Sequence, residues 1–448
     1  MRQCVGCAAV VWASVAGACA AGPAEVDVRA AMEKSAAFFQ SISVHGGYAG
    51  IYSPDLEQRY GEALYEKARK TEIWIQPPGT PTVGEAFLRA WRATGDQRYF
   101  QAARNVARAL AWAQSAHGGW DHRADVSALT PEAAAPQRRK TQCTFDDRIS
   151  QGALGFLMSF DQVADEPWLS EAVDLAFKHL LDAQDAKGGW PQWYPLRGGY
   201  HDHFTFNDGT ISDCIAVLLR ANDLYRRKEL LDGARRGGDF IILSQLPAPQ
   251  AGWAQQYTRD LKPASARAFE PAGVCSAVTA RNIRMLIELY LVLNDERYLQ
   301  PVPKARAWLD RSKLADGKWA RFYEAATNRP MYGDRDGKVH YTLEEISEER
   351  RTGYSWQSDY GIASALKLYD KVKQLGRDKV LAERARPPSA SSRKKRAEGL
   401  AAQVSQAIAA MDAQGRWITK NMIHCKDFVR NFNLLCEYLE LLSDKPGK

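Results

Sequence analysis

Residues 113–120, Ala-Gln-Ser-Ala-His-Gly-Gly-Trp, and residues 183–190, Ala-Gln-Asp-Ala-Lys-Gly-Gly-Trp, are two copies of one short motif. Looser copies occur along the chain, each with an aromatic residue one or two positions after a glycine. The six aromatic residues are Tyr48, Trp120, Trp190, Trp253, Trp319 and Trp417. Successive positions differ by 72, 70, 63, 66 and 98 residues. A recurrence of this length predicts a repeated supersecondary unit.

Pairs of helices are expected between these turns. Residues 167–183 show the pattern, with Pro167 in the first turn, where its missing N–H costs no hydrogen bond. The apolar residues on one face of this segment are Leu169, Val173, Ala176 and Leu180. Other segments with helical periodicity are 97–114, 210–227, 278–293, 358–373 and 425–442. Segments with an alternating β pattern are few, so the sequence predicts an all-α protein.

Six helical hairpins joined by glycine turns can close into an α/α toroid, and this is the fold that we predict. The turns would then gather on one face of the ring. Their Trp and Tyr rings, with Asp and Arg side chains nearby, would line a shared groove. The alternative role for an aromatic ring is core packing, which we expect for more than half of the 13 Trp.

The composition is that of an ordinary globular protein. The 448 residues (50.0 kDa) are 45% hydrophobic and 25% charged, which excludes a disordered, collagen-like or coiled-coil chain. Lys and Arg number 60 against 53 Asp and Glu, which gives a net charge of +7 and a pI near 8.9. A mild excess of this kind suits an acidic ligand without requiring nucleic acid, and we expect no nucleic-acid partner.

Residues 1–21 have the features of a secretory signal peptide. Arg2 provides a basic start, residues 5–16 are apolar, and Ala18-Cys19-Ala20 is a small-x-small cleavage site. The signal peptide predicts a secreted or periplasmic protein, and no other segment is apolar over enough residues for a membrane helix. We expect a monomer. Cys19 weakly resembles a lipoprotein site without the usual Leu, and lipid anchoring is the less favoured outcome. Residues 22–448 are expected to form a single toroid domain.

Five of the eight cysteines follow the signal peptide. They are Cys143, Cys214, Cys275, Cys425 and Cys436. An odd number leaves at least one thiol unpaired. Five cysteines in a chain of this length do not make a disulfide framework, so the fold must rest on its hydrophobic core.

The last and longest interval between aromatic turns contains an insertion. Residues 384–396 are basic, rich in Pro and Ser, and have no apolar face. A flexible surface loop is the favoured interpretation, and a polyanion-binding arm is the alternative.

Two acidic turns precede predicted helices in successive hairpins. They are Thr144-Phe145-Asp146-Asp147 and Thr205-Phe206-Asn207-Asp208-Gly209. Asp146 and Asp208 are 62 residues apart, close to one repeat, so we expect them at equivalent places in the same mouth of the toroid. Carboxylates gathered there can bind a hard cation such as calcium, or act as the acid and base of a glycosidase. Helix capping by Asp is compatible with either role.

Arginine-containing segments form the second group of candidates. They are Lys262–Glu270, Arg335–Gly337 and Arg350–Tyr354. Each Arg could be an ordinary surface residue. Several in turns beside one mouth favour recognition of carboxylates, which the planar guanidinium binds in a bidentate manner. The chain has no nucleophile elbow, phosphate-binding glycine loop or HExxH zinc helix, and His201-Asp202-His203 is more typical of a solvated turn than of a metal site.

Several of these segments occur together in one known family. The chain resembles polysaccharide lyase family ten, the pectate lyases with a helical toroid fold, over roughly residues 40 to 360. The matching segments are Ile73–Gly84, Gly188–Pro195, Thr205–Gly209, Lys262–Glu270, Ala320–Glu324 and Glu349–Tyr354. One such segment alone is not specific, but the set is.

The resemblance implies calcium-assisted β-elimination of polygalacturonate. Asp146 and Asp208 correspond to the family's calcium ligands, and Asp147 is a third candidate. Arg267 corresponds to the base that removes the C5 proton, with Glu270 placed to orient it. Arg is a weak base at neutral pH because its pKa exceeds about 12, and nearby cations would help it act. The residues expected to bind the acidic polysaccharide are Lys262, Arg335, Arg350, Arg351, Trp190, Asn207 and Tyr354.

Two positions depart from the family pattern. Arg148 stands where the family usually has Gly, and the stretch 273–277 lacks the expected Glu. Two alternatives to the lyase stay open. One is a toroidal glycosidase that uses Asp146 and Asp208, and the other, given these departures, is a non-catalytic pectin-binding protein.

Overall fold

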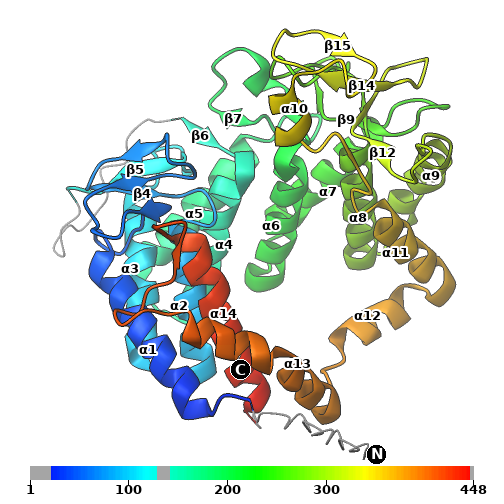
Figure 1. The fold of residues 1–448 in the computed structure, drawn as a ribbon. Coiled ribbons are helices and arrows are strands. Elements are labelled where there is room, and N and C mark those ends of the chain that lie inside the picture. Colours follow the sequence, from blue (N-terminus) through cyan, green and yellow to red (C-terminus); the bar gives the residue numbers. More distant parts are fainter. Residues whose placement is uncertain (1–21, 129–141, 444–448) are drawn as a thin grey trace, which may run out of the picture.

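The structure is a computed structural model that describes residues 22–128 and 142–443. The predicted signal peptide, residues 1–21 with Cys19, lies outside the described residues. Within the described chain, six pairs of helices are arranged around a ring, which confirms the predicted α/α toroid (Figure 1). One helix of each pair faces the centre of the ring, and the other lies outside it.

The helices follow one another in the order outer, inner, outer, inner. The inner helices are α2 (Thr80–Thr94), α4 (Ile149–Asp161), α6 (Thr210–Tyr225), α8 (Ser276–Leu293), α11 (Ile362–Leu375) and α14 (Cys425–Leu442). The outer helices are α1 (Glu25–Ile42), α3 (Gln97–Ala113), α5 (Pro167–Asp182), α7 (Lys228–Leu243), α9 (Pro301–Arg311) and α13 (Ala390–Ala409). Two shorter helices are α10 (Glu348–Gly353) and α12 (Arg377–Ala385).

Neighbouring inner helices pack against one another in the order α14, α2, α4, α6, α8, α11. The two ends of the chain meet because α14 packs against both α1 and α2. The rings of Phe39 and Phe428 stack at this junction with their centroids 3.7 Å apart. Gly84 lets α2 approach α4 closely, since a Cβ there would lie 2.5 Å from the Phe156 ring. The chain returns from α11 to α14 through α12 and α13 (Figure 1).

Short links join α2, α4, α6 and α8 to the next outer helix, and α12 joins α11 to α13. Longer connections return to the next inner helix at the other end of the ring (Figure 1). Between α2 and α3, Gly95 ends one helix with a φ of 75° and Asp96 caps the next by accepting the Arg98 backbone N–H at 2.8 Å. The strands of the described chain all lie in the long connections. The end of the ring that carries these connections is called the mouth below.

The strands are short, and most span two residues. Those in the first three connections are β1 (Ile51–Tyr52), β2 (Arg59–Tyr60), β3 (Lys67–Ala68), β4 (Glu72–Trp74), β5 (Arg123–Asp125), β6 (Cys143–Thr144), β7 (Trp193–Tyr194) and β8 (Phe204–Thr205). Those in the last three are β9 (Trp253–Ala254), β10 (Gln256–Tyr257), β11 (Val274–Cys275), β12 (Trp319–Ala320), β13 (Phe322–Tyr323), β14 (Pro330–Gly333), β15 (Val339–His340), β16 (Gln357–Ser358), β17 (Ile418–Thr419) and β18 (Met422–His424).

Antiparallel pairing links neighbouring connections around the mouth. β4 pairs with β5, β6 with β7, β8 with β10, and β11 with β13. β1 pairs with β18 and so joins the first connection to the last. The connections therefore hold one another in place, and residues far apart in sequence meet at the mouth.

The repeated Trp residues anchor each connection to the outer helix before it. Each indole N–H donates to a backbone carbonyl of that helix. The bonds run from Trp120 to Leu110 (2.9 Å), Trp190 to Leu180 (2.8 Å), Trp253 to Ile241 (2.7 Å), Trp319 to Leu309 (2.7 Å) and Trp417 to Ala407 (2.8 Å). These rings and that of Tyr48 are buried. The prediction that the turn aromatics line a groove is therefore wrong, because a buried indole needs a partner for its N–H and finds it in the helix.

The helices predicted from periodicity are present, with ends within a few residues of those expected. The prediction of a flexible insertion at 384–396 is wrong. Its first residues end α12 and its last begin α13, while Pro387 and Pro388 separate the two helices and the Ser389 side chain caps α13. Basic side chains in the segment form ion pairs, such as Arg384 with Glu288. The long interval between turns is filled by β14, β15, α10 and α12.

All five cysteines of the described chain are buried, and no disulfide joins any two of them. The fold therefore rests on its hydrophobic core and not on a disulfide framework, as the sequence predicts. No described helix combines the length and the apolar character needed to cross a bilayer.

Candidate active site

Two successive connections end in the same kind of acidic turn, a 3₁₀ turn directly before an inner helix. These turns are η1 (Asp146–Arg148) before α4 and η3 (Asn207–Gly209) before α6. Asp147 (φ 45°, ψ 29°) and Asp208 (φ 46°, ψ 18°) have nearly the same left-handed backbone. Asp147 is thus the equivalent of Asp208, and Asp146 that of Asn207. The predicted equivalence of Asp146 with Asp208 is wrong by one residue.

Arg148 does not disturb this turn. It has a φ of 61° and a ψ of 26°, and Gly209 at the equivalent position has a φ of 87° and a ψ of 6°. A left-handed conformation costs an L-residue about 1 kcal/mol, a modest penalty. The second departure, the stretch 273–277, is built into β11 and the start of α8, where Ser276 donates to the Ala320 carbonyl at 2.7 Å. Arg148 thus keeps the same turn as Gly209, and residues 274–277 lie in regular secondary structure.

The three aspartates form one cluster at the mouth. One carboxylate oxygen from each of Asp146, Asp147 and Asp208 lies within 4.8 Å of the others. Each carboxylate accepts a hydrogen bond from an amide side chain. The bonds run from Gln192 to Asp146 (2.6 Å), from Gln76 to Asp147 (2.9 Å) and from Asn207 to Asp208 (2.6 Å). Within the described part of the chain, none of the three forms an ion pair with Lys or Arg.

The crowding of negative charge perturbs these groups. Burial, followed by the charges of Asp146, Asp208 and Glu62, raises the pKa of Asp147 to about 7. Burial and the charge of Asp208 also raise the pKa of Asp146, against the opposing effects of Gln192, His122 and Arg267. A cation placed among the three carboxylates would relieve this repulsion.

The donor set fits a hard cation such as calcium. Asp146 Oδ1 is buried and has no hydrogen-bond partner among the described residues, and the same holds for Asn207 Oδ1. Buried oxygens without a partner are costly unless something satisfies them. Calcium takes six to eight oxygen ligands at about 2.3–2.6 Å, so oxygens that share one ion lie up to about 5 Å apart. The residues present therefore suit calcium in both chemistry and spacing.

A second network surrounds Arg267. Its guanidinium donates two hydrogen bonds to the Glu270 carboxylate, from Nε at 2.9 Å and from a terminal nitrogen at 2.7 Å. Glu270 is only 2% exposed and also accepts from Gln255 (2.9 Å) and from the Tyr354 hydroxyl (3.0 Å). The expected orientation of Arg267 by Glu270 is thus present. The same ion pair raises the pKa of the Arg267 guanidinium further above its ordinary value.

The predicted arginines are only partly brought together. Arg267 and Arg350 both lie over the Phe269 ring, at 4.9 and 4.5 Å from its centroid. Glu349 pairs with Arg350 and also with Arg335, at 3.0 Å. Arg351 and Lys262 are exposed and stand outside this network. Arg267 is close enough to the acidic cluster for its charge to lower the pKa of Asp146.

The structure contradicts the prediction that Trp190 binds the substrate. The ring is fully buried and its N–H is bound to Leu180, so stacking of a sugar on this ring is excluded. Asn207 and Tyr354, by contrast, contact other candidate site residues. Asn207 donates a hydrogen bond to Asp208, and the Tyr354 hydroxyl donates one to Glu270, the partner of Arg267.

Residues two positions after the turn aromatics form a layer of the site that the sequence reasoning missed. These residues are His122, Gln192, Gln255 and Arg321. Their carbonyls accept the backbone N–H of a residue just before or at the start of the neighbouring inner helix, for example Gln192 from Phe145 at 2.9 Å and Gln255 from Phe206 at 2.8 Å. Their constant offset from the aromatic residue is the signal that could have found them.

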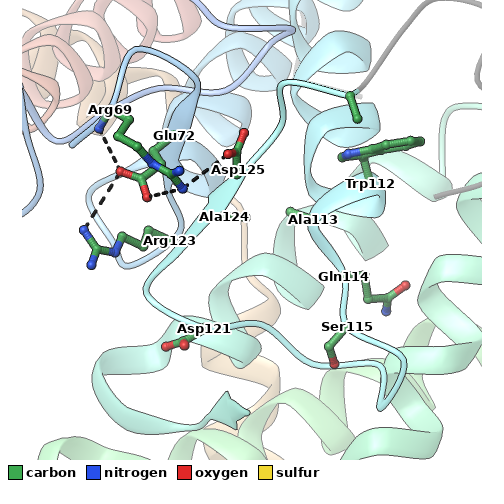
Figure 2. Close-up of a pocket in the computed structure, with 11 residues that line it drawn as sticks. Arg69, Glu72, Trp112, Ala113, Gln114, Ser115, Asp121, Arg123, Ala124 and Asp125 are labelled. Carbon is green, nitrogen blue, oxygen red and sulfur yellow. Dashed lines mark hydrogen bonds and ion pairs between the residues drawn. The ribbon is translucent and has the colours of Figure 1, made fainter. Parts of the chain in front are cut away.

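A separate pocket lies beside β4 and β5, and none of Asp146, Asp147 and Asp208 lines it (Figure 2). Its charged residues largely neutralise one another: Arg69 pairs with Glu72 at 3.0 Å and with Asp125 at 3.2 Å, and Arg123 lies 3.9 Å from Glu72. Asp121 faces this pocket and pairs with the His122 ring at 2.9 Å. Two arginines and three carboxylates line this pocket, so it has no excess of positive charge to offer an acidic ligand.

Comparison with solved structures agrees with this architecture. A mutant family 10 polysaccharide lyase from Cellvibrio cellulosa, in complex with trigalacturonic acid, matches with a TM-score of 0.50 and 23% identity, over 66% of this chain and 98% of that one. The family 10 polysaccharide lyase from the same organism matches with a TM-score of 0.51 and 23% identity, over 66% and 97% of the two chains. No curated protein sequence gives a significant match. The fold is that of the toroidal polysaccharide lyases.

The family model described as pectic acid lyase matches residues 114–318 and 315–364, more than half of the chain. The chain belongs to the pectic acid lyase family, and the protein is a polysaccharide lyase of the pectate type. The matched range includes both acidic turns and the Arg267 network, so the parts that carry the resemblance are also the parts that meet at the mouth.

Proposed function

We propose that the protein cleaves polygalacturonate by calcium-assisted β-elimination at the mouth of the toroid. The observation that carries this proposal is the acidic cluster, in which three carboxylates each place one oxygen within 4.8 Å of the others and have no Lys or Arg partner among residues 22–128 and 142–443. The Arg267 network lies beside it. An anionic polymer requires positive charge, and the combination of a cation site with arginines provides it.

The reaction transfers one proton from C5 to a base and breaks the C4–O bond. A base removes the C5 proton of a galacturonate residue, the electrons form a C4–C5 double bond, and the C4–O bond breaks. The departing oxygen takes up a proton, and no water is consumed. A calcium ion held by Asp146, Asp147 and Asp208 would neutralise the substrate carboxylate, on which negative charge develops as the proton leaves.

We assign the base to Arg267. Its side chain is 46% exposed and held in a fixed orientation by Glu270, so it can approach a substrate without losing its position. The ion pair favours the protonated guanidinium and therefore opposes this role. The active fraction is then small at neutral pH and increases as the solution becomes more alkaline.

Substrate carboxylates are assigned to the remaining cationic side chains of the mouth. Arg335 and Arg350 share the carboxylate of Glu349, so this ion pair alone does not match both of their positive charges. Lys262 and Arg351 are exposed and add to it. An acidic polysaccharide is therefore the proposed substrate, as in the Cellvibrio structure with trigalacturonic acid.

The glycosidase alternative fits the geometry less well. The two carboxyl groups of a glycosidase are about 5–5.5 Å apart in retaining enzymes and about 6.5–9.5 Å in inverting ones. Here three carboxylates converge within 4.8 Å, which suits ligation of an ion better than two separated catalytic roles.

Product chemistry tests the proposal. Purified protein is incubated with polygalacturonate, and the products are followed by ultraviolet absorbance and mass spectrometry. A β-elimination gives an absorbing C4–C5 double bond and fragments that carry no added water. Fragments with added water and no absorbance would identify a hydrolase, and binding without fragments would identify a non-catalytic pectin-binding protein.

A further inference from the structure

The segment between β7 and β8 forms a closed loop at the mouth. The Asp202 carboxylate accepts the backbone N–H groups of Arg197 (3.1 Å) and Gly198 (2.9 Å). The Gln192 N–H donates to the His201 carbonyl at 2.9 Å, which ties the end of the loop to its start. The loop thus has a defined shape of its own.

Partly exposed aromatic rings line this loop, in contrast to the buried ring of Trp190. The Trp193 ring lies 5.1 Å from His201 and 6.3 Å from His122, and Tyr200 stacks on His201 at 3.9 Å. Together they form a row of rings along one side of the mouth. Rings of this kind commonly contact the apolar faces of sugars through their own apolar surfaces.

The Arg197 guanidinium lies on the Trp193 ring, 3.4 Å from its centroid. It is exposed and forms no ion pair with a described carboxylate. Arg267, Arg335 and Arg350 differ in this respect, since each is already paired with a glutamate. A guanidinium stacked on an indole keeps its N–H edge free and pre-oriented for a bidentate contact with a carboxylate.

The row of rings is attached to the acidic cluster. Gln192, the residue before Trp193, donates to Asp146 at 2.6 Å. Tyr200 lies close enough to Asp146, Arg267 and Arg197 to respond to all three charges. A polymer bound across the acidic cluster would therefore continue over Tyr200 and His201 toward Arg197.

We propose that Arg197, supported by Trp193, binds the carboxylate of a galacturonate residue outside the cleavage position, and that Tyr200 and His201 contact the sugars between. This subsite deepens the proposed function and rests on it. It favours chains long enough to reach from the acidic cluster to Arg197.

The main test compares Arg197→Gln with the wild type on polygalacturonate and on trigalacturonate. Loss of charged hydrogen bonds to a carboxylate should raise KM for the polymer by about tenfold or more and leave kcat unchanged. Trigalacturonate should be affected less, because it need not reach Arg197. Trp193→Ala should act in the same direction by removing the support. Arg226→Gln, at the link between α6 and α7, is the matched control and should change neither constant.

An equal KM for Arg197→Gln and the wild type on the polymer would overturn the subsite, as would a fall in kcat at constant KM. A lower melting temperature would mark a folding defect, so both variants are also checked by thermal unfolding. Measuring equilibrium binding in the absence of turnover tests the Arg197 subsite independently of the proposed lyase activity. With a chelator present, wild-type protein should bind a long saturated oligogalacturonate more tightly than Arg197→Gln does.

That advantage should vanish when the oligosaccharide is fully methyl-esterified, because the carboxylate is then blocked. A binding difference that persists on the ester would contradict recognition of the carboxylate. If the wild type binds as described but yields no unsaturated product, the subsite stands and the proposed lyase activity fails.

Discussion

The left-handed backbone of Asp147 and Asp208 turns two carboxylates toward each other from successive connections. Such a conformation is uncommon for residues other than glycine and is kept where the surrounding structure enforces it. Here the strand pairing before each turn and the inner helix after it fix the geometry. The consequence is a cluster of carboxylates whose repulsion a cation can relieve.

Replacing Asp147 by Asn tests this cluster directly. The amide keeps the shape but removes one negative charge and one anionic ligand, so calcium affinity, measured by titration calorimetry, should fall markedly. Turnover should fall on the order of 100-fold, the effect expected when a group that stabilises transition-state charge is lost. Asp223→Asn, on the exposed side of α6, is the control and should bind calcium as the wild type does. Unchanged calcium binding in Asp147→Asn would remove this residue from the site.

The Arg267→Lys variant distinguishes between two roles of Arg267, a catalytic base and a member of a purely structural ion pair. Lysine keeps the charge but cannot donate two parallel hydrogen bonds to Glu270, so its nitrogen should be misplaced and turnover should fall about 100-fold or more. In the wild type, kcat should rise with pH well above neutrality, because the ion pair raises the pKa of the guanidinium. Near-native turnover in Arg267→Lys, or a rate that falls as the solution becomes alkaline, would reject Arg267 as the base.

The residues of the site were only partly predictable from the sequence. Asp146, Asp147 and Asp208 could be found because two similar acidic turns precede helices about one repeat apart. The sequence could not show which residues of the two turns are equivalent, since this depends on which residue adopts the left-handed conformation. Trp190 was assigned to the substrate because residue type does not show where an indole N–H finds its acceptor.

At the scale of elements, the glycine–aromatic turn sets how closely neighbouring hairpins approach. Gly188 has a φ of 96°, and a Cβ there would lie 2.1 Å from the Arg236 carbonyl oxygen in the next outer helix. Gly118 makes the same kind of approach to Leu175, with 2.2 Å to the carbonyl oxygen. The repeat thus preserves a glycine where two pieces of backbone touch.

Gly188→Ala should therefore destabilise the protein by more than the conformational strain of a left-handed alanine. Gly95 has a φ of 75° but open space around it, so Gly95→Ala reports the conformational strain by itself, about 1 kcal/mol. Gly188→Ala adds a backbone collision and should cost at least about 2 kcal/mol in the free energy of unfolding, measured with urea. Equal losses in the two variants would show that the close approach does not matter.

Helix positions were well predicted because apolar periodicity and the starting and ending residues agree. Residues 384–396 were misread because their charges and prolines resemble a loop. Their helices are stabilised by partners that local composition does not reveal, such as Glu288 for Arg384 and Glu437 for Arg396. The two-residue strands lie below the length at which an alternating pattern can be recognised.

At the scale of the molecule, a buried histidine links stability to pH. His179 on α5 is fully buried and stacks on Phe145, which directly precedes the acidic turn η1, with the ring centroids 4.9 Å apart. Burial lowers the pKa of His179 from 6.5 to about 3. Below pH 6.5 the unfolded chain binds a proton there that the folded protein does not, so stability falls as the solution becomes more acidic.

His179→Phe should remove this dependence. In the wild type, His179 should lower the free energy of unfolding by up to about 1.4 kcal/mol for each unit that the pH falls between pH 6.5 and about 3. The difference in unfolding free energy between variant and wild type should therefore move in favour of the variant as the pH is lowered from 7 toward 5. A difference that stays constant over this range would mean that His179 is not neutral in the folded protein.

The proposed cleavage of an anionic polymer requires a cation at the mouth. The most direct measurement is the ultraviolet absorbance produced from polygalacturonate by chelator-treated protein while calcium is added back. Absorbance should be nearly absent at first, return with a saturable dependence on calcium, and require far more calcium in Asp147→Asn. Full activity in the presence of the chelator, in wild type and variant alike, would contradict calcium-assisted cleavage at the mouth.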